Sequence, residues 1–166
     1  MSLVTAVVVW LHIFSAVGWL GAVMVFGMLV GPLLPGFSPS TRAELVMKLF
    51  PRFVRYIQVF AGTTVVFGVA AALAFTNGNM ALFAPTSNFG LFISVGALLA
   101  LVALVVGLAV VVPATNKVIR LTGELAKNPG PPSPELQKAS NRTRMGGGFV
   151  LVLLIIVLVC MVAAAS

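Results

Sequence analysis

The residue with the clearest chemical potential is His12, the only histidine in the 166-residue chain. It lies between the two tryptophans, Trp10 and Trp19, inside an apolar run that covers residues 3–34. A lone imidazole at membrane depth is costly unless it is paired or binds a ligand, so it marks a candidate functional site. The chemistry of the chain therefore depends on which other groups reach His12.

Two residues of the same predicted helix share a face with His12. Ser15 follows it by three positions and Trp19 by seven, which is the spacing of neighbours along one helical face. The Ser15 hydroxyl could accept the imidazole N–H, which would fix the tautomer and leave the second nitrogen free to bind a metal. An equally weighted interpretation is structural, with His12 hydrogen-bonded to Ser94 or to a carbonyl across the bundle. Trp19 is too deep for an interfacial aromatic belt.

Composition indicates which elements must position these residues. The chain is 60% hydrophobic and 8% charged, with a mean hydropathy of +1.15, whereas soluble domains carry roughly 25% charged residues. A helix crosses a bilayer with about 20 apolar residues. The sequence predicts an all-α four-helix bundle that forms a single transmembrane domain over residues 1–166. Its spans cover about residues 3–30, 51–75, 89–112 (with an extension to about 125) and 145–165.

A short connection precedes the second predicted span, which starts at Pro51, a proline suited to the first turn of a helix. Residues 40–50 have the pattern of an amphipathic helix that lies at the membrane interface. Leu45, Leu49 and Phe50 are expected to face lipid from this short interfacial helix.

The charged residues lie in or beside only two connections, those between the first and second spans and between the third and fourth. All ten Lys and Arg residues and all three acids are there, whereas residues 77–88 and both termini carry no charged side chain. The positive-inside rule then predicts a protein of the plasma membrane with both termini outside and both basic loops cytoplasmic. The same rule explains the net charge of +7 without a nucleic-acid partner.

Several kinds of chemistry find no support in the sequence. Cys160 is the only cysteine, so the chain has no internal disulfide and no site with several thiolates. The sequence has no HExxH motif, no Gly-Lys-Ser/Thr loop and no acidic residue within a span. Metal-dependent hydrolysis, phosphoryl transfer and a carboxylate proton relay are therefore unsupported.

Helix geometry predicts which residues of other spans lie at the depth of His12. With a rise of about 1.5 Å per residue, His12 lies roughly 14 Å from the start of its span, Gly68 and Gly96 roughly 12 Å deep, and Ser94 roughly 9 Å deep. Two glycines beside an imidazole would leave room for a flat cofactor. The alternative is close packing of helices, which is the ordinary use of glycine in membrane bundles.

The first span also carries a family resemblance. The pattern Leu11-His12, then Trp19-Leu20-Gly21, followed by a basic lead into a second span and by Gly68, resembles the CopD-type copper-resistance membrane domain. It is similar as well to the HemJ-type protoporphyrinogen oxidases, whose first span carries a haem-linked histidine. The resemblance implies that His12 is a haem or metal ligand. The HemJ pattern has a functional lysine early in the third span, and residues 88–94 of this chain contain none.

These observations favour a haem b-binding membrane protein that acts in electron transfer or redox sensing. His12 would be the axial ligand, with Ser15, Trp19, Gly68, Ser94 and Gly96 around the cofactor. One histidine gives a five-coordinate haem or, across a symmetric homodimer, a bis-histidine site. The alternatives are a domain that transports copper or a small solute, and a structural subunit of a larger membrane complex that holds no cofactor.

Overall fold

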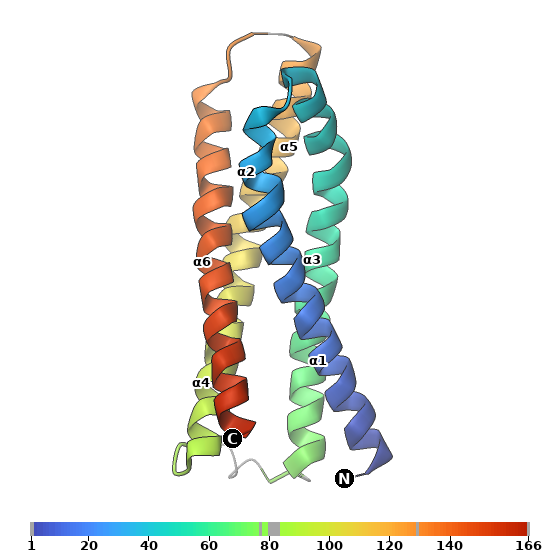
Figure 1. Cartoon of the computed structure of the whole chain (residues 1–166), viewed down its shortest axis with the longest axis vertical. Helices are drawn as coiled ribbons and strands as arrows, with labels where there is room; N and C mark the ends of the chain where they lie inside the picture. Colours follow the sequence, from blue (N-terminus) through green and yellow to red (C-terminus); the bar gives the residue numbers. More distant parts are fainter. Residues whose placement is uncertain (1, 77, 80–83, 129, 166) are drawn as a thin grey trace.

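Four long helical columns form the part of the chain that the computed structural model describes, residues 2–76, 78–79, 84–128 and 130–165 (Figure 1). The first column contains α1 (Leu3–Met24), a π-helical segment (Val25–Val30), α2 (Gly31–Leu33) and a 3₁₀ turn (Leu34–Gly36). The second column is α3 (Pro39–Thr76). The third contains α4 (Asn88–Val106), a π-helical segment (Gly107–Val111) and α5 (Val112–Lys127), and the fourth is α6 (Pro134–Ala165). The prediction of an all-helical fold with four apolar helices is confirmed.

All four columns are long and apolar enough to cross a membrane. Their bounds as candidate spans are Leu3–Gly36, Pro39–Thr76, Asn88–Lys127 and Pro134–Ala164. The chain is therefore a multi-pass membrane protein whose apolar helices suit contact with a lipid bilayer.

Local polar groups define the helix ends at the uncharged end of the bundle. The hydroxyl of Ser2 accepts the Thr5 N–H at 3.1 Å, and that of Ser87 accepts the Gly90 N–H at 3.1 Å, so each serine caps the helix that follows it. In the turn after α3, Gly78 has a φ of 82°, in the left-handed region that glycine enters at low cost.

Each π-helical segment lies directly before a proline. Pro32 follows Val25–Val30 by two residues, and Pro113 follows Gly107–Val111 by two residues. A proline ring clashes with the carbonyl four residues earlier. The wider π turn, in which the Gly31 N–H bonds the carbonyl five residues back on Phe26, relieves this crowding without breaking the column.

The predicted interfacial helix is not a separate element. Residues 40–50 are the first turns of α3, which continues through Pro51 without interruption. Of the residues on the face expected to contact lipid, Phe50 is only 4% exposed and packs with Val46 on Val118 of α5 and Ala139 of α6. Leu49 packs against this cluster, and Leu45 is half-buried. The physical reason is that α5 and α6 extend equally far and offer this face an apolar partner.

The sequence predicts a polar helical lead-in over residues 135–144 before the fourth span at 145–165. The two segments form one continuous helix, α6, which begins at Pro134.

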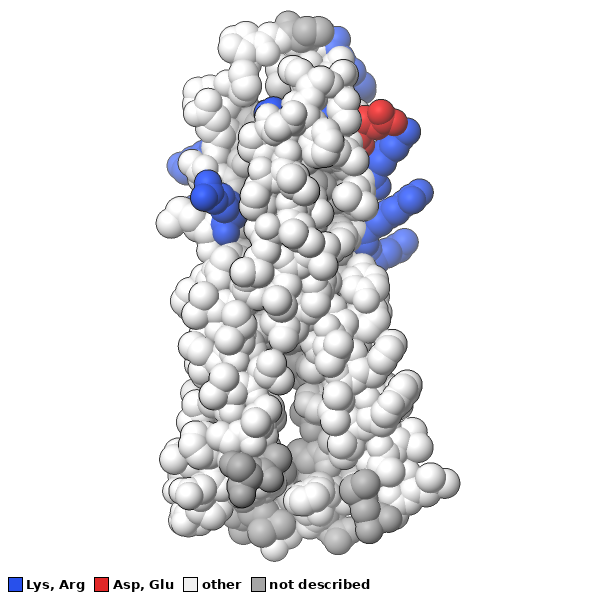
Figure 2. All heavy atoms as spheres, in the orientation of Figure 1, with Lys and Arg blue, Asp and Glu red and all other residues white. Residues whose placement is uncertain are grey.

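The columns associate as two pairs, α1 with α3 and α4 with α6. The pairs diverge toward the end that carries both termini, as Figure 1 shows. Figure 2 shows a narrow opening between them in that uncharged half, while the Lys and Arg side chains gather in the other half. All three acids of the chain are ion-paired there, in the contacts Lys48–Glu44, Lys117–Glu135 and Arg120–Glu124.

Candidate functional site

The imidazole of His12 is hydrogen-bonded to the backbone of α3. Its Nδ1 lies 2.9 Å from the carbonyl oxygen of Thr64. Because a carbonyl oxygen can only accept, this contact places a proton on Nδ1, and in the neutral imidazole Nε2 then carries the lone pair. His12 itself is half-buried at this position. His12 can therefore offer Nε2 to a metal, while the hydrogen bond at Nδ1 fixes the orientation of the ring.

Gly68 makes this contact possible. In a helix the carbonyl of residue i points toward residue i+4, and Gly68 is four residues after Thr64. A Cβ atom added to Gly68 would lie 2.9 Å from Cε1 and 3.1 Å from Nδ1 of His12. Any side chain at this position would therefore push the imidazole away from the Thr64 carbonyl. The predicted proximity of His12 and Gly68 is present in the structure.

Ser15 and Trp19 lie on the buried face of α1, as the spacing predicts. Each is only 3% exposed. Trp19 packs in the core cluster with Ala61 of α3, Ala103 of α4 and Val150 of α6, so all four columns meet around it. The group that hydrogen-bonds His12 Nδ1 is the Thr64 carbonyl, where the sequence suggested the Ser15 hydroxyl.

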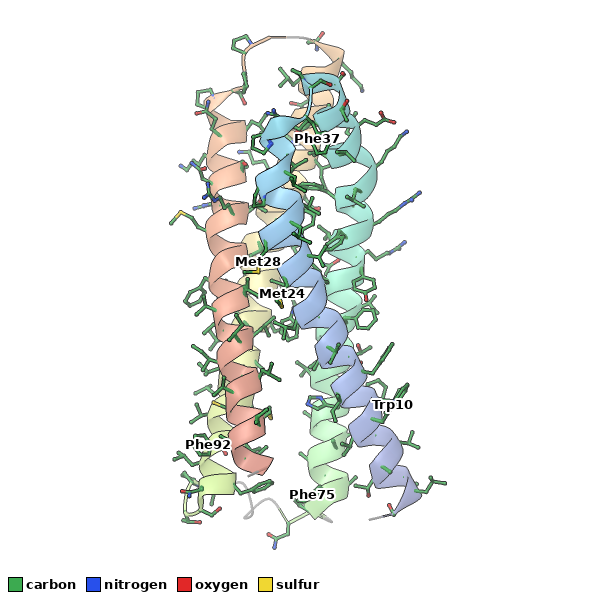
Figure 3. All side chains as sticks on the ribbon, in the orientation of Figure 1. Trp10, Met24, Met28, Phe37, Phe75 and Phe92 are labelled. Carbon is green, nitrogen blue, oxygen red and sulfur yellow. The ribbon has the colours of Figure 1, made fainter. Side chains whose placement is uncertain are left out.

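Trp10 has a different environment from Trp19. It is 61% exposed and stacks on Phe14 with ring centroids 5.3 Å apart. Figure 3 shows Trp10 on the outer side of α1, directed away from the other columns. Its position suits an aromatic side chain that contacts lipid.

Gly96 belongs to the other helix pair. A Cβ atom at Gly96 would meet Cε of Met161 at 2.8 Å and Cβ of Cys160 at 3.3 Å, so the missing side chain accommodates α6. Ser94 is half-buried two residues earlier on α4. The structure thus brings His12 together with Gly68, and it places Gly96 at the α4–α6 contact.

The same close packing recurs between α1 and α3. A Cβ atom at Gly18 would overlap the ring of Phe60. Gly18 of α1 therefore receives a side chain of α3, while Gly68 of α3 receives the imidazole of α1. The two glycines bring the helices close enough for the bond between His12 and the Thr64 carbonyl.

Sequence reasoning missed the contribution of Thr64. A backbone carbonyl has no residue signature, and the Thr64 hydroxyl donates within its own helix to the Phe60 carbonyl at 2.7 Å. One indirect signal was present in the spacing Thr64-x-x-x-Gly68, because a glycine at i+4 leaves the carbonyl of residue i uncovered.

The described residues contain no group of three or more His, Cys, Asp and Glu side chains that could hold a metal ion. Comparisons with protein-family models, with curated proteins and with solved structures find no match to this chain.

Proposed function

We propose that this chain binds haem b through Nε2 of His12 and acts in electron transfer or redox sensing. The observation that supports this most is the 2.9 Å contact between His12 Nδ1 and the Thr64 carbonyl. A metal-binding histidine almost always donates its second N–H to a carbonyl or carboxylate, which fixes the ring and raises its basicity. His12 has this arrangement at a depth where an unused imidazole would be costly.

The residues around His12 suit the edge of a flat macrocycle better than a small ion. A proximal histidine is sufficient to hold haem iron, whereas a bare metal ion in a protein needs several ligands. When bound, haem b would supply one-electron transfer. Thr64 orients the imidazole through its carbonyl, Gly68 admits the ring to that carbonyl, and Trp19 and Ser15 are buried on the same helix as His12.

The uncharged surroundings of His12 would influence the reduction potential of a bound haem. Every Lys, Arg, Asp and Glu of the sequence lies in residues 42–55 or 117–144, and none lies near position 12 in the chain. An apolar environment disfavours the oxidised iron, which carries one more positive charge, and so raises the reduction potential.

We also propose that the protein lies in the plasma membrane with both termini outside and the charged end in the cytoplasm. In support, the termini lie at one end of the bundle and the charged residues gather toward the other (Figures 1 and 2). Basic residues accumulate on the cytoplasmic side of membrane proteins.

The test is the absorption spectrum of the protein purified in detergent, recorded oxidised and after reduction. Wild-type protein should show a Soret band, which His12→Ala should lose. Trp10→Phe is the matched control, because it alters a lipid-facing residue two positions away on the same helix. Adding imidazole to His12→Gly should restore the band, which separates the loss of a ligand from misfolding.

Two results would contradict the haem proposal. One is a Soret band that persists in His12→Ala, and the other is wild-type protein that stays colourless after haem is supplied. A colourless protein that binds Cu(I) through His12 would favour the transport alternative. A colourless protein that co-purifies with a partner subunit would favour a structural role.

A further inference from the structure

A second site lies in the charged half of the bundle, apart from His12. A cavity of about 1480 Å³ occupies the space between the columns there, and His12 is not among its lining residues. Trp19 is at its inner end, seven residues or about 10 Å along α1 from His12. Residues of both π-helical segments, Val25–Val30 and Gly107–Val111, contribute to its walls. Such segments occur frequently at functional sites.

Glycines keep this cavity open. Five of the lining glycines have nothing within 4 Å of the position where a Cβ atom would be, and four of them lie on three of the columns: Gly27, Gly107, Gly147 and Gly148. Gly107 and Gly147 are half-buried, and Gly27 and Gly148 are exposed. The empty space at their Cβ positions distinguishes these four glycines from Gly18, Gly68 and Gly96, whose missing side chains make room for a neighbour. Protein interiors are otherwise close-packed. The space beside these four glycines is available to a ligand.

The lining of the cavity changes from apolar to polar along its length. The inner part is formed by apolar side chains of all the columns, among them Trp19, Val23, Ile57, Ala61, Leu104, Val150 and Leu151. Toward the charged end the lining becomes polar, with Gln137, Ser140, Asn141 and Arg144 on α6 and Arg42 on α3. A molecule that fits this gradient has an apolar tail and a polar head.

The polar end of the cavity is lined by two arginines, Arg42 and Arg144, and by one acid, Glu44, whose carboxylate is paired with Lys48. The three acids are paired with Lys48, Lys117 and Arg120, and neither Arg42 nor Arg144 forms an ion pair within the described residues. Arg42 donates to the carbonyls of Leu34, Pro35 and Phe37, which fixes its guanidinium at the rim without cancelling its charge. The complementary head group is therefore an anion.

We propose that this cavity binds one anionic phospholipid. Its phosphate would lie at Arg42 and Arg144, and an acyl chain would extend between the π-helical segments to Trp19. Basic pockets between transmembrane helices are suited to anionic head groups. The volume also exceeds the roughly 300–1,000 Å³ of pockets for compact small ligands, as a molecule with a long chain requires.

The position of Trp19 provides a direct measurement. In the Trp10→Phe variant, Trp19 is the only tryptophan, so its fluorescence reports occupancy of the inner end of the cavity. The full-length protein in detergent micelles is titrated with phosphatidylglycerol that carries bromine near the ends of its acyl chains, and separately with brominated phosphatidylcholine. Bromine quenches tryptophan at contact distance. We expect saturable quenching by the anionic lipid at a lower mole fraction than by the neutral one.

Two variants and one control test the two ends of the site. Arg144→Gln should raise the amount of anionic lipid needed for half-maximal quenching by about tenfold, as expected for loss of one charged hydrogen bond. Gly148→Leu should abolish quenching, because it fills the cavity where a Cβ atom meets no neighbour. Gly62→Leu is the matched control, since Gly62 of α3 is equally uncrowded but does not line the cavity.

The proposal is overturned if both lipids quench Trp19 at the same mole fraction, since the site would then have no preference for an anion. It is also overturned if neither lipid quenches Trp19, or if Gly148→Leu is quenched like Gly62→Leu. The titrations use haem-free protein, because a haem bound at His12 would itself quench Trp19 by energy transfer. Under this condition the results do not depend on whether His12 can bind haem.

Discussion

At the scale of single residues, His12 and Thr64 meet because Gly68 has no side chain. The rise per residue predicted correctly that His12 and Gly68 share a depth. It did not predict the partner of the imidazole, because the partner is a main-chain carbonyl that any residue type would supply. For Gly96 the rise per residue predicted the depth in the membrane but not the direction in which the residue faces around the axis of α4. Gly96 faces Met161 of α6.

The tautomer of His12 is a measurable consequence of this contact. Because the chain has one histidine, ¹⁵N-histidine labelling gives a single imidazole spectrum. In haem-free protein we expect the Nδ1-protonated form, favoured about fivefold by a hydrogen bond worth about 1 kcal/mol. Gly68→Ala should lose this preference, since its Cβ would displace the ring. Gly62→Ala should keep it, and an Nε2-protonated wild type would contradict the assignment.

At the scale of elements, apolarity predicted the spans but not the full helices. The polar residues at 40–50 looked like a boundary because a hydropathy criterion ends a span where charge begins, whereas those at 135–144 were expected to form a helical lead-in to the fourth span. The helices continue because α3, α5 and α6 pack on one another beyond the apolar region, through residues such as Phe50 and Val118. The π-helical segments could not be derived from Pro32 and Pro113 alone, since Pro51 lies in α3 without one.

The contact between α5 and α6 is sensitive to pH at one position. The ammonium of Lys117 hydrogen-bonds Glu135 at 2.8 Å and lowers the pKa of this carboxyl from its usual value. A lowered pKa in the folded state means that the pair contributes stability above the ordinary pKa of about 4.5, and that the contribution is lost as pH falls through the lowered value.

Lys117→Met should therefore raise the pKa of Glu135 toward its ordinary value. The measurement is a pH titration of the side-chain carboxyl ¹³C signals, which are few because the chain has only three acids. Lys138→Met serves as the control, because the charge of Lys138 has the smallest effect on Glu135. An unchanged titration of Glu135 in Lys117→Met would contradict the pairing.

At the scale of the whole molecule, the two candidate sites occupy opposite halves of one bundle. The core around Trp19, where all four columns meet, lies between the imidazole of His12 and the cavity lined by Arg42 and Arg144. The halves differ because the helix pairs diverge at the uncharged end, whereas α5 packs on both α3 and α6 at the charged end.

The proposed sidedness predicts which connections an external reagent reaches. In a Cys160→Ala background, single cysteines are placed at Thr86 before α4 and at Ser133 before α6, both exposed positions. A membrane-impermeant maleimide added to intact cells should label Thr86→Cys, and it should label Ser133→Cys only after the cells are permeabilised. The reverse pattern would contradict the orientation.

The length of the columns has a consequence for recognition by soluble proteins. α3 has 38 residues and is therefore about 57 Å long, while the hydrocarbon core of a bilayer is about 30 Å thick. Because the charged residues gather at one end, the surplus suits a helical head outside the hydrocarbon core at that end. An antibody or a crystal lattice would find rigid, water-exposed epitopes on this head.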